Sequence, residues 1–137
     1  MPPRDLKITP GNIYHIYNRG VNKERIFYSD KNYLFFIYKM SRYLVQHAEV
    51  FAYCLMPNHF HILVQVNDEF FVAKSMQPLL VSYVKALHSE LNRIGPLFQG
   101  RFQANLIEDN EYFLDCLKYI FLNPVHAGLV KMPREWR

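Results

Sequence analysis

Two histidines separated by one residue carry the clearest chemical signal in the sequence. His59 and His61 lie in the segment Met-Pro-Asn-His-Phe-His, which leads into an apolar, β-branched run. On an extended strand, residues two apart point to the same face, so the two imidazoles would lie side by side. Two neutral imidazoles can bind one divalent cation when a third ligand comes from elsewhere in the fold. Pairs of ordinary histidines show the same spacing, so the spacing alone leaves both interpretations open.

A second polar pair lies near the end of the chain. Tyr119 and Asn123 are four residues apart, so on a helix one lies above the other. With Tyr112 and Asp115 they are predicted to lie opposite the apolar stripe of that helix. The predicted stripe consists of Phe113, Leu114, Leu117, Ile120 and Phe121. A hydroxyl and an amide oxygen on one helical face could reach a cation held by the histidines; a solvated face with a helix-terminal asparagine is the alternative.

Basic residues give a third and weaker signal. The formal net charge is +4, which is compatible with a polyanionic partner, and the 16% of aromatic residues suits both a core and stacking on unpaired bases. Arg101 follows a glycine, where a guanidinium can approach a phosphate closely. The predicted cationic track consists of Arg19, Lys23, Arg25, Lys85, Arg93 and Arg101. An ordinary solvated surface would explain the same charges.

The other histidines are interpreted as structural. His15 and Asn18 are three apart on a predicted strand, so they should face opposite sides of it. His88 is expected on the surface, and His47 and His126 at the ends of elements, where capping is the simpler role. The sequence contains no Walker motif, no dinucleotide-binding glycine pattern, no nucleophile elbow and no HExxH motif.

Alternating strand and helix patterns must position these groups. Strands are predicted at residues 12–18, 49–55, 61–66 and 102–107, with a turn at residues 56–58. Helices are predicted from an Asp30 N-cap to about residue 44, over about residues 76–93, and over about residues 110–123, where Pro124 should end the last one. This order predicts an α+β fold, ferredoxin-like or RRM-like (βαββαβ), with an antiparallel sheet and a C-terminal helix. Two helices on one face would leave the other face, or the edges, for function or dimerisation.

Composition and length set the outer limits. The 137 residues are expected to form one domain over residues 1–137, and 50% hydrophobic with 20% charged residues excludes a disordered chain. No apolar run is long enough for a membrane span, so a cytoplasmic protein is expected. Cys54 and Cys116 lie in apolar surroundings and are predicted to be reduced core residues.

Taken together, these motifs resemble a known family. His59-Phe60-His61, within Cys-Leu-Met-Pro-Asn-His-Phe-His-Ile-Leu-Val, is similar to the HUH motif of single-tyrosine transposases, which include insertion-sequence and REP-associated tyrosine transposases. Residues 115–130 resemble that family's catalytic helix, in which a tyrosine is followed four residues later by asparagine or glutamine. Residues 97–104 resemble the segment that often precedes this helix. The resemblance runs from about Tyr14 to Val130.

The resemblance implies a role for each residue of the two motifs. His59, His61 and Asn123 would bind magnesium or manganese, and Tyr119 would be the nucleophile that attacks a phosphodiester of single-stranded DNA. In this family the reaction leaves a 5′-phosphotyrosine intermediate and a free 3′-hydroxyl, and the DNA commonly carries a hairpin or palindromic end. A divalent cation would stabilise charge building on the phosphate, and three neutral ligands would leave it electropositive toward that anion. A bacterial, nucleoid-associated location follows from the same resemblance.

Several points stay open at this stage. Tyr112 lies on the same helix as Tyr119, and the spacing to Asn123 favours Tyr119 as the nucleophile. Family members differ in whether one chain or a homodimer builds the active site, and a homodimer is weakly favoured here. The chain stops soon after the last motif where relatives commonly continue, so a truncation is possible. Two other functions compete with transposition: a domesticated protein that binds DNA hairpins without cutting them, and a metal-dependent phosphodiesterase that uses water.

Overall fold

A computed structural model of the chain describes residues 7–126, with side chains as far as Asn123. The described elements are β1 (Ile13–Arg19), η1 (Val21–Lys23), α1 (Asp30–Tyr43), β2 (Ala48–Met56), β3 (His59–Val66), η2 (Phe71–Met76), α2 (Gln77–Leu91), β4 (Gln103–Ile107) and α3 (Asn110–His126). Their strands form a four-stranded antiparallel sheet in the order β2-β3-β1-β4. The predicted α+β fold and its order of elements are confirmed.

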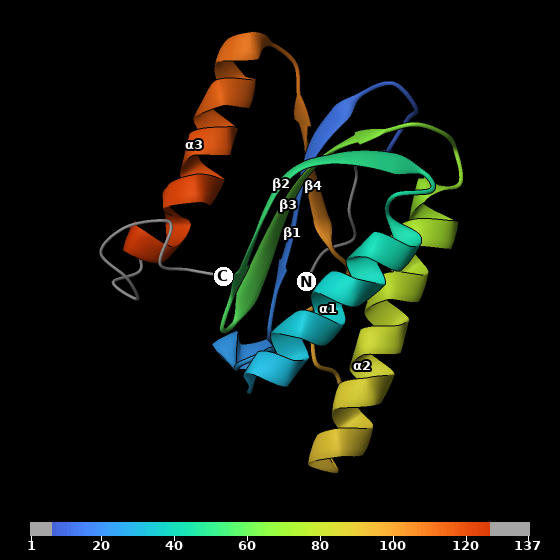
Figure 1. Cartoon of the computed structure of the whole chain (residues 1–137), viewed down its shortest axis with the longest axis vertical. Helices are drawn as coiled ribbons and strands as arrows, with labels where there is room; N and C mark the ends of the chain where they lie inside the picture. Colours follow the sequence, from blue (N-terminus) through green and yellow to red (C-terminus); the bar gives the residue numbers. More distant parts are fainter. Residues whose placement is uncertain (1–6, 127–137) are drawn as a thin grey trace.

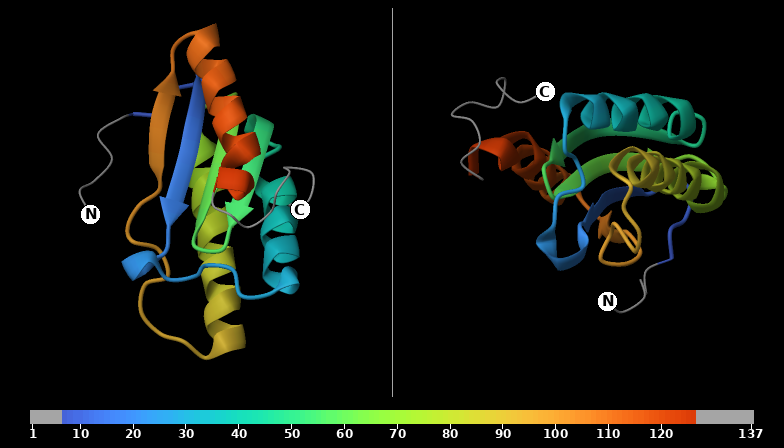
Figure 2. Two further views of the ribbon diagram at one scale, coloured as in Figure 1. Left: turned by 90° about the vertical axis from the view of Figure 1, so that its left-hand side faces the viewer. Right: turned by 90° about the horizontal axis from the view of Figure 1, so that it is seen from below.

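The described chain forms three layers (Figure 1). The crossover helices α1 and α2 lie together on one face of the sheet, and α3 lies on the other. Figure 2 shows α3 in front of β2 and β3, while β1 and β4 remain beside it, outside its cover. The face that the prediction left free is therefore half covered, and the polar residues of β1 and β3 lie at the margin of that cover.

Strand alternation gives the two faces of the sheet different chemistry. On β3, Phe60 and Ile62 point into the core beneath α1 and α2, whereas His59, His61 and Leu63 point to the α3 side. A smaller apolar cluster joins Leu63 to α3; it consists of Cys54, Met56, Leu63, Ile107, Cys116 and Ile120. Both cysteines are free and buried, as predicted, and burial raises the pKa of each thiol to about 11.

The first helix is capped by Ser29, and the predicted Asp30 cap is wrong by one residue. The Ser29 hydroxyl accepts from the Asn32 N–H at 3.3 Å, and the Asn32 amide oxygen accepts from the Ser29 N–H at 3.1 Å. Two helix-terminal donors are satisfied by this reciprocal pair. Asp30 occupies the first turn, where its negative charge favours the positive end of the helix dipole.

The predicted turn between the second and third strands is tighter than expected. β2 ends at Met56 and β3 begins at His59, so only Pro57 and Asn58 connect them and His59 belongs to the strand. The chain that follows β1 packs against this turn, and the Gly20 N–H donates a hydrogen bond to Asn58 O at 2.9 Å. A Cβ at Gly20 would lie 2.0 Å from the Glu24 carbonyl oxygen, so this close approach requires glycine.

Two helix boundaries also differ from the prediction. α2 begins after a π-turn, η2, and it ends at Leu91 because Asn92 adopts a left-handed conformation, three residues before Gly95. α3 continues through Pro124 to His126. Proline removes one backbone donor, but it does not end the helix at Asn123 as predicted.

Candidate active site

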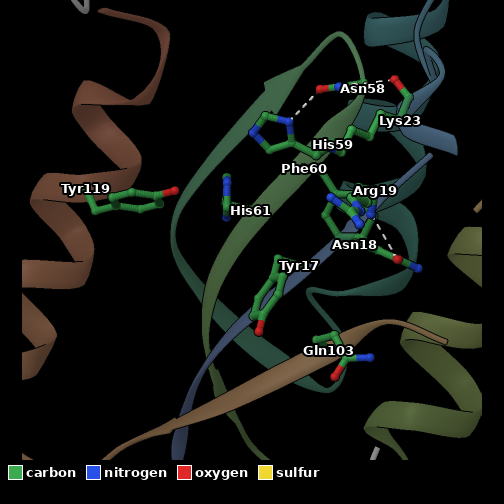
Figure 3. Close-up of a pocket in the computed structure, with 10 residues that line it drawn as sticks. All are labelled: Tyr17, Asn18, Arg19, Lys23, Asn58, His59, Phe60, His61, Gln103 and Tyr119. Carbon is green, nitrogen blue, oxygen red and sulfur yellow. Dashed lines mark hydrogen bonds between the residues drawn. The ribbon is translucent and has the colours of Figure 1, made fainter. Parts of the chain in front are cut away.

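An open pocket of about 610 Å³ lies where β1, β3 and α3 meet. Antiparallel pairing of β1 and β3 places Tyr17 opposite His61 and Arg19 opposite His59. Figure 3 shows the side chains that line the pocket, with Tyr119 reaching toward the strands from α3. The two predicted motifs, about 60 positions apart in the chain, therefore meet at one place.

The hydrogen bonds of His59 fix its tautomer. His59 Nδ1 lies 2.7 Å from the Asn58 amide oxygen, which can only accept, so Nδ1 carries the proton. The Asn58 amide is itself oriented, because its Nδ2 donates to the Lys23 carbonyl at 3.3 Å. Burial lowers the pKa of His59, with the Asn123 contact opposing the shift, and a neutral ring leaves a lone pair on Nε2.

That lone pair faces another acceptor. His59 Nε2 lies 3.3 Å from the Asn123 amide oxygen. Two acceptors at this distance repel each other unless a cation lies between them or the amide turns to donate its N–H₂ group. Two ligands at right angles around a small divalent cation, with bonds of about 2.1 Å, are about 3.0 Å apart. The separation of Nε2 and Oδ1 is close to that value.

His61 presents a second nitrogen to the same region. Its Nδ1 lies 2.9 Å from His15 Nε2, and its Nε2 is buried without a hydrogen-bond partner. Burial, followed by the neighbouring charges of His15 and His59, lowers the pKa of His61 to about 3, so the ring is neutral at pH 7. A buried polar atom without a partner is costly, and a bound cation would satisfy it.

These groups could hold one small divalent cation. Among residues 7–126 no cluster combines three or more His, Cys, Asp or Glu side chains that could hold a metal ion. The available donors are instead two imidazole nitrogens, from His59 and His61, and the amide oxygen of Asn123. Imidazole suits transition metals and amide oxygens suit magnesium and manganese, so the donor set is mixed and neutral.

Tyr119 completes the pocket from the same chain. Its ring packs edge-on against the ring of His61, with centroids 5.4 Å apart and an interplanar angle of 89°. The residue is 47% exposed, and Figure 3 shows its hydroxyl directed toward the strands. A phenol beside a cation site can act as a nucleophile toward a phosphate held by that cation.

Comparison with known proteins identifies the family of the chain. The sequence model described as "Transposase IS200 like" matches residues 11–122, which is most of the chain. The chain belongs to the IS200-like transposase family.

Two similar proteins point the same way. A Haemophilus influenzae protein, provisionally named a REP-associated tyrosine transposase, is 28% identical over 99 residues, which cover 64% of this chain and 56% of that relative. The match therefore spans little more than half of the relative's length. A solved structure of a REP-associated tyrosine transposase bound to a REP hairpin has a TM-score of 0.75 at 16% identity, covering 99% of this chain and 80% of that one. At this identity the likeness shows the shared fold.

Asn123 lies on the buried side of α3 and not on the predicted solvated side. It is 7% exposed and faces the sheet with Cys116 and Ile120, whereas Leu114 and Phe121 of the predicted apolar stripe are exposed. The buried face is centred on positions 116, 120 and 123, because α3 packs Cys116 inward as a small apolar residue. This buried position brings the Asn123 amide oxygen to His59 Nε2.

The six predicted DNA-binding cations do not line one pocket. Arg19 and Lys23 line the active-site pocket, and Lys85 and Arg101 line a second pocket of about 510 Å³ beside α2. The other two are engaged with residues near Tyr28: Arg25 donates to Phe27 O at 2.9 Å, and Arg93 donates to the Tyr28 hydroxyl at 3.0 Å and lies 3.6 Å from Glu24 Oε1.

His15 is the site residue that the sequence interpretation missed. It was correctly expected to face away from Asn18, but it was assigned no chemistry. In the structure it is 9% exposed and its ring lies beside that of His61, with ring centroids 5.0 Å apart. The available signal was strand alternation, since His15 and Tyr17 share one face of β1, but only the pairing of β1 with β3 brings His15 to His61.

Within residues 7–126 no helix combines the length and hydropathy that crossing a membrane requires.

Proposed function

We propose that this transposase cleaves and rejoins single-stranded DNA, with Tyr119 as the nucleophile and a magnesium or manganese ion bound by His59, His61 and Asn123. The observation that carries the proposal is the buried, unpartnered His61 Nε2 beneath the Tyr119 ring. The family supports transposition as the activity. In the proposal one chain supplies all four residues.

The proposed substrate is DNA with a hairpin, or palindromic, end. The solved REP-associated transposase with the same fold was bound to a REP hairpin, which supports this choice of DNA. At the pocket, Arg19 and Lys23 offer positive charge to a backbone phosphate, and the half-buried Tyr17 ring offers a surface on which an unpaired base could stack. An open pocket suits a flexible single strand.

The proposed reaction exchanges one phosphodiester bond for another. A bound divalent ion would withdraw electron density from the scissile phosphate and stabilise the charge that develops on its oxygens. The Tyr119 oxygen forms a bond to phosphorus as the phenol loses its proton, and the bond from phosphorus to the 3′-oxygen breaks. That oxygen takes up a proton and leaves as a 3′-hydroxyl. The resulting 5′-phosphotyrosine keeps the phosphodiester energy, so a later 3′-hydroxyl can displace Tyr119 and rejoin the strand.

The histidines and Asn123 position the reacting groups. Asn58 holds His59, and the sheet beneath holds His61, so the lone pairs of both rings are oriented before DNA arrives. The packing of Tyr119 against His61 holds the phenol beside those lone pairs. Neutral ligands avoid placing negative charge next to an anionic substrate.

The decisive experiment looks for the covalent protein–DNA product. The full chain is incubated with Mn²⁺ or Mg²⁺ and labelled single-stranded hairpin DNA taken from the flanks of the gene, and the products are separated on a denaturing gel. Tyr119→Phe is expected to abolish the adduct, because it removes the attacking oxygen and keeps the ring that packs on His61. Tyr112→Phe, on the same helix and outside the pocket lining, is the matched control and should form the adduct normally.

Each other outcome identifies a different function. An adduct that persists in Tyr119→Phe contradicts the assignment of the nucleophile. Metal-dependent cleavage without any adduct indicates a phosphodiesterase that uses water. Tight hairpin binding without cleavage, under either ion, indicates a domesticated DNA-binding protein.

A further inference from the structure

The proposed mechanism leaves one buried polar side chain at the site without a role. His15 touches neither of the predicted metal-binding nitrogens, yet it is 9% exposed and its Nε2 lies 2.9 Å from His61 Nδ1. A histidine at this depth must be explained by a partner, because a polar ring buried without one is destabilising.

We propose that His15 is a positioning residue: its Nε2 accepts a hydrogen bond from the His61 Nδ1–H group and so holds His61 in the tautomer whose Nε2 lone pair faces the cation site. This inference rests on the proposed metal site. Ligating histidines commonly use their other ring nitrogen in this way, and the partner fixes both tautomer and ring orientation.

The surroundings of His61 favour this direction for the hydrogen bond. Were His15 the donor, His61 would carry its proton on Nε2, and that N–H would be buried without an acceptor. With His15 as acceptor, Nε2 bears a lone pair, which a cation can bind.

Ring packing adds orientation to the choice of tautomer. The rings of His15 and His61 lie side by side and close to coplanar, with centroids 5.0 Å apart and an interplanar angle of 25°, as an in-plane hydrogen bond between their nitrogens requires. Tyr119 packs edge-on against the His61 ring and also meets the His15 ring edge-on, with centroids 6.4 Å apart. His15 therefore contacts the His61 ring against which the proposed nucleophile packs.

The site then contains two parallel supports of different chemistry. Asn58 Oδ1 accepts from His59 Nδ1 at the turn, and His15 Nε2 accepts from His61 Nδ1 on the neighbouring strand. Both arrangements leave Nε2 of each ring available. Because each ligand has its own acceptor, loss of His15 should affect His61 while His59 stays oriented.

Three variants of the full chain test the inference. His15→Leu removes the acceptor and keeps an apolar side chain, whereas His15→Gln keeps an acceptor oxygen near the position of the lost Nε2. Ile13→Val, on the same face of β1 two residues away, is the matched packing control. Thermal unfolding establishes that each variant is folded.

The first readout is Mn²⁺ affinity by titration calorimetry, without DNA. His15→Leu is expected to bind Mn²⁺ about 10- to 100-fold more weakly than the unsubstituted chain. His15→Gln should recover most of that loss, and Ile13→Val should bind normally. Equal affinity of His15→Leu and the unsubstituted chain overturns the inference and leaves the metal site intact. If His15→Leu does not fold, His15→Gln alone tests the inference. A folded His15→Gln variant that binds Mn²⁺ no better than an unfolded chain then overturns it.

The second readout needs no metal. Nitrogen-15 NMR of histidine-labelled protein at pH 7 reports which nitrogen of each ring carries the proton. His61 is expected as the Nδ1–H tautomer in the unsubstituted chain and as a mixture in His15→Leu. A His61 ring protonated on Nε2 overturns the inference. An unsubstituted chain with the expected tautomer but no Mn²⁺ affinity supports the His15 hydrogen bond and refutes the metal site, so the two failures are distinguishable.

Discussion

The two faces of the sheet are built from the same four strands but differ in chemistry: one is packed with aromatic rings, and the other carries the polar candidate site. Beneath α1 and α2 the rings of Phe27, Phe36, Phe60 and Tyr83 pack with centroids about 5 Å apart, and the one hydroxyl among them donates to the Ile26 carbonyl. Aromatic pairs in this geometry stabilise a core beyond their burial alone. We call the part of the sheet under these rings the closed face; beside it α2 borders the second pocket, and His88 Nε2 on α2 is buried without a hydrogen-bond partner.

The face under α3 is half apolar and half polar. Its apolar half joins Cys116 and Ile120 of α3 to β2 and β3, and its polar half gathers His15, His59 and His61 beside Asn123. One of these nitrogens is buried with no partner. The comparison teaches that the closed face supplies the rigidity that allows the other face to hold polar groups in an unfavourable, chemically useful arrangement.

The largest expected effect comes from opening the closed face. Phe36→Ala removes a ring that is fully buried among other rings, and it should lower the free energy of unfolding by about 3–5 kcal/mol in a urea titration. Phe51→Ala, at an exposed ring that meets Phe113 on the α3 side, should cost about 1 kcal/mol. Equal losses would break the comparison between the faces.

The next effect is the pH dependence of the polar face. In the metal-free protein, burial lowers the pKa of His15 to about 4 and of His61 to about 3, against about 6.5 in the unfolded chain. Between pH 6.5 and 4 the unfolded state therefore binds more protons than the folded one, so stability falls as the pH falls. We expect a loss of about 2 kcal/mol between pH 6 and pH 5, measured by urea titration at each pH.

A substitution isolates the histidines from other acid-sensitive groups. His15→Gln removes one of the three rings whose pKa burial lowers, so its loss between pH 6 and pH 5 should be clearly smaller. Parallel pH profiles for the two chains would show that these histidines do not set the slope. Added Mn²⁺ should reduce the loss, since it competes with protons for the same lone pairs.

The smallest effect is expected on the outer side of α3. Leu114 is 61% exposed, so Leu114→Gln should change the free energy of unfolding by less than about 0.5 kcal/mol and leave adduct formation unchanged. Ile120→Ala, on the buried side of the same helix, should cost about 2–5 kcal/mol. A large effect of Leu114→Gln would mean that the outer side of α3 is covered in solution. A second copy of the chain, as in the expected homodimer, would then be the first candidate for that cover.

Much of this arrangement could be predicted from local patterns. The alternation of apolar and polar residues predicted the order of strands and helices, and the two-residue spacing correctly placed His59 and His61 on one face of a strand. The four-residue spacing predicted Tyr119 and Asn123 on one helix. The roles assigned to these four residues, and the identity of the metal, stay predictions.

Other features were beyond local patterns. The predicted apolar stripe of α3 was partly wrong: Phe113, Leu117 and Ile120 pack on the sheet side, but Leu114 and Phe121 are exposed. A helix with apolar residues on several sides can dock along more than one of them, and the choice depends on the sheet it meets. The division of the six cations between two pockets likewise depends on how α2 and the chain before β4 lie against β1.

The sequence alone determined which residues lie on the same face of each strand or helix, because side-chain direction repeats every two residues in a strand and every three to four in a helix. The tertiary structure alone decided which of those faces meet. The register of β1 against β3 brought His15 to His61, and the docking of α3 brought Asn123 to His59 and Tyr119 to His61. The His15–His61 and His59–Asn123 contacts join residues 46 and 64 positions apart. Local periodicity carries no information over such separations, so only the packing of the whole sheet fixes this geometry.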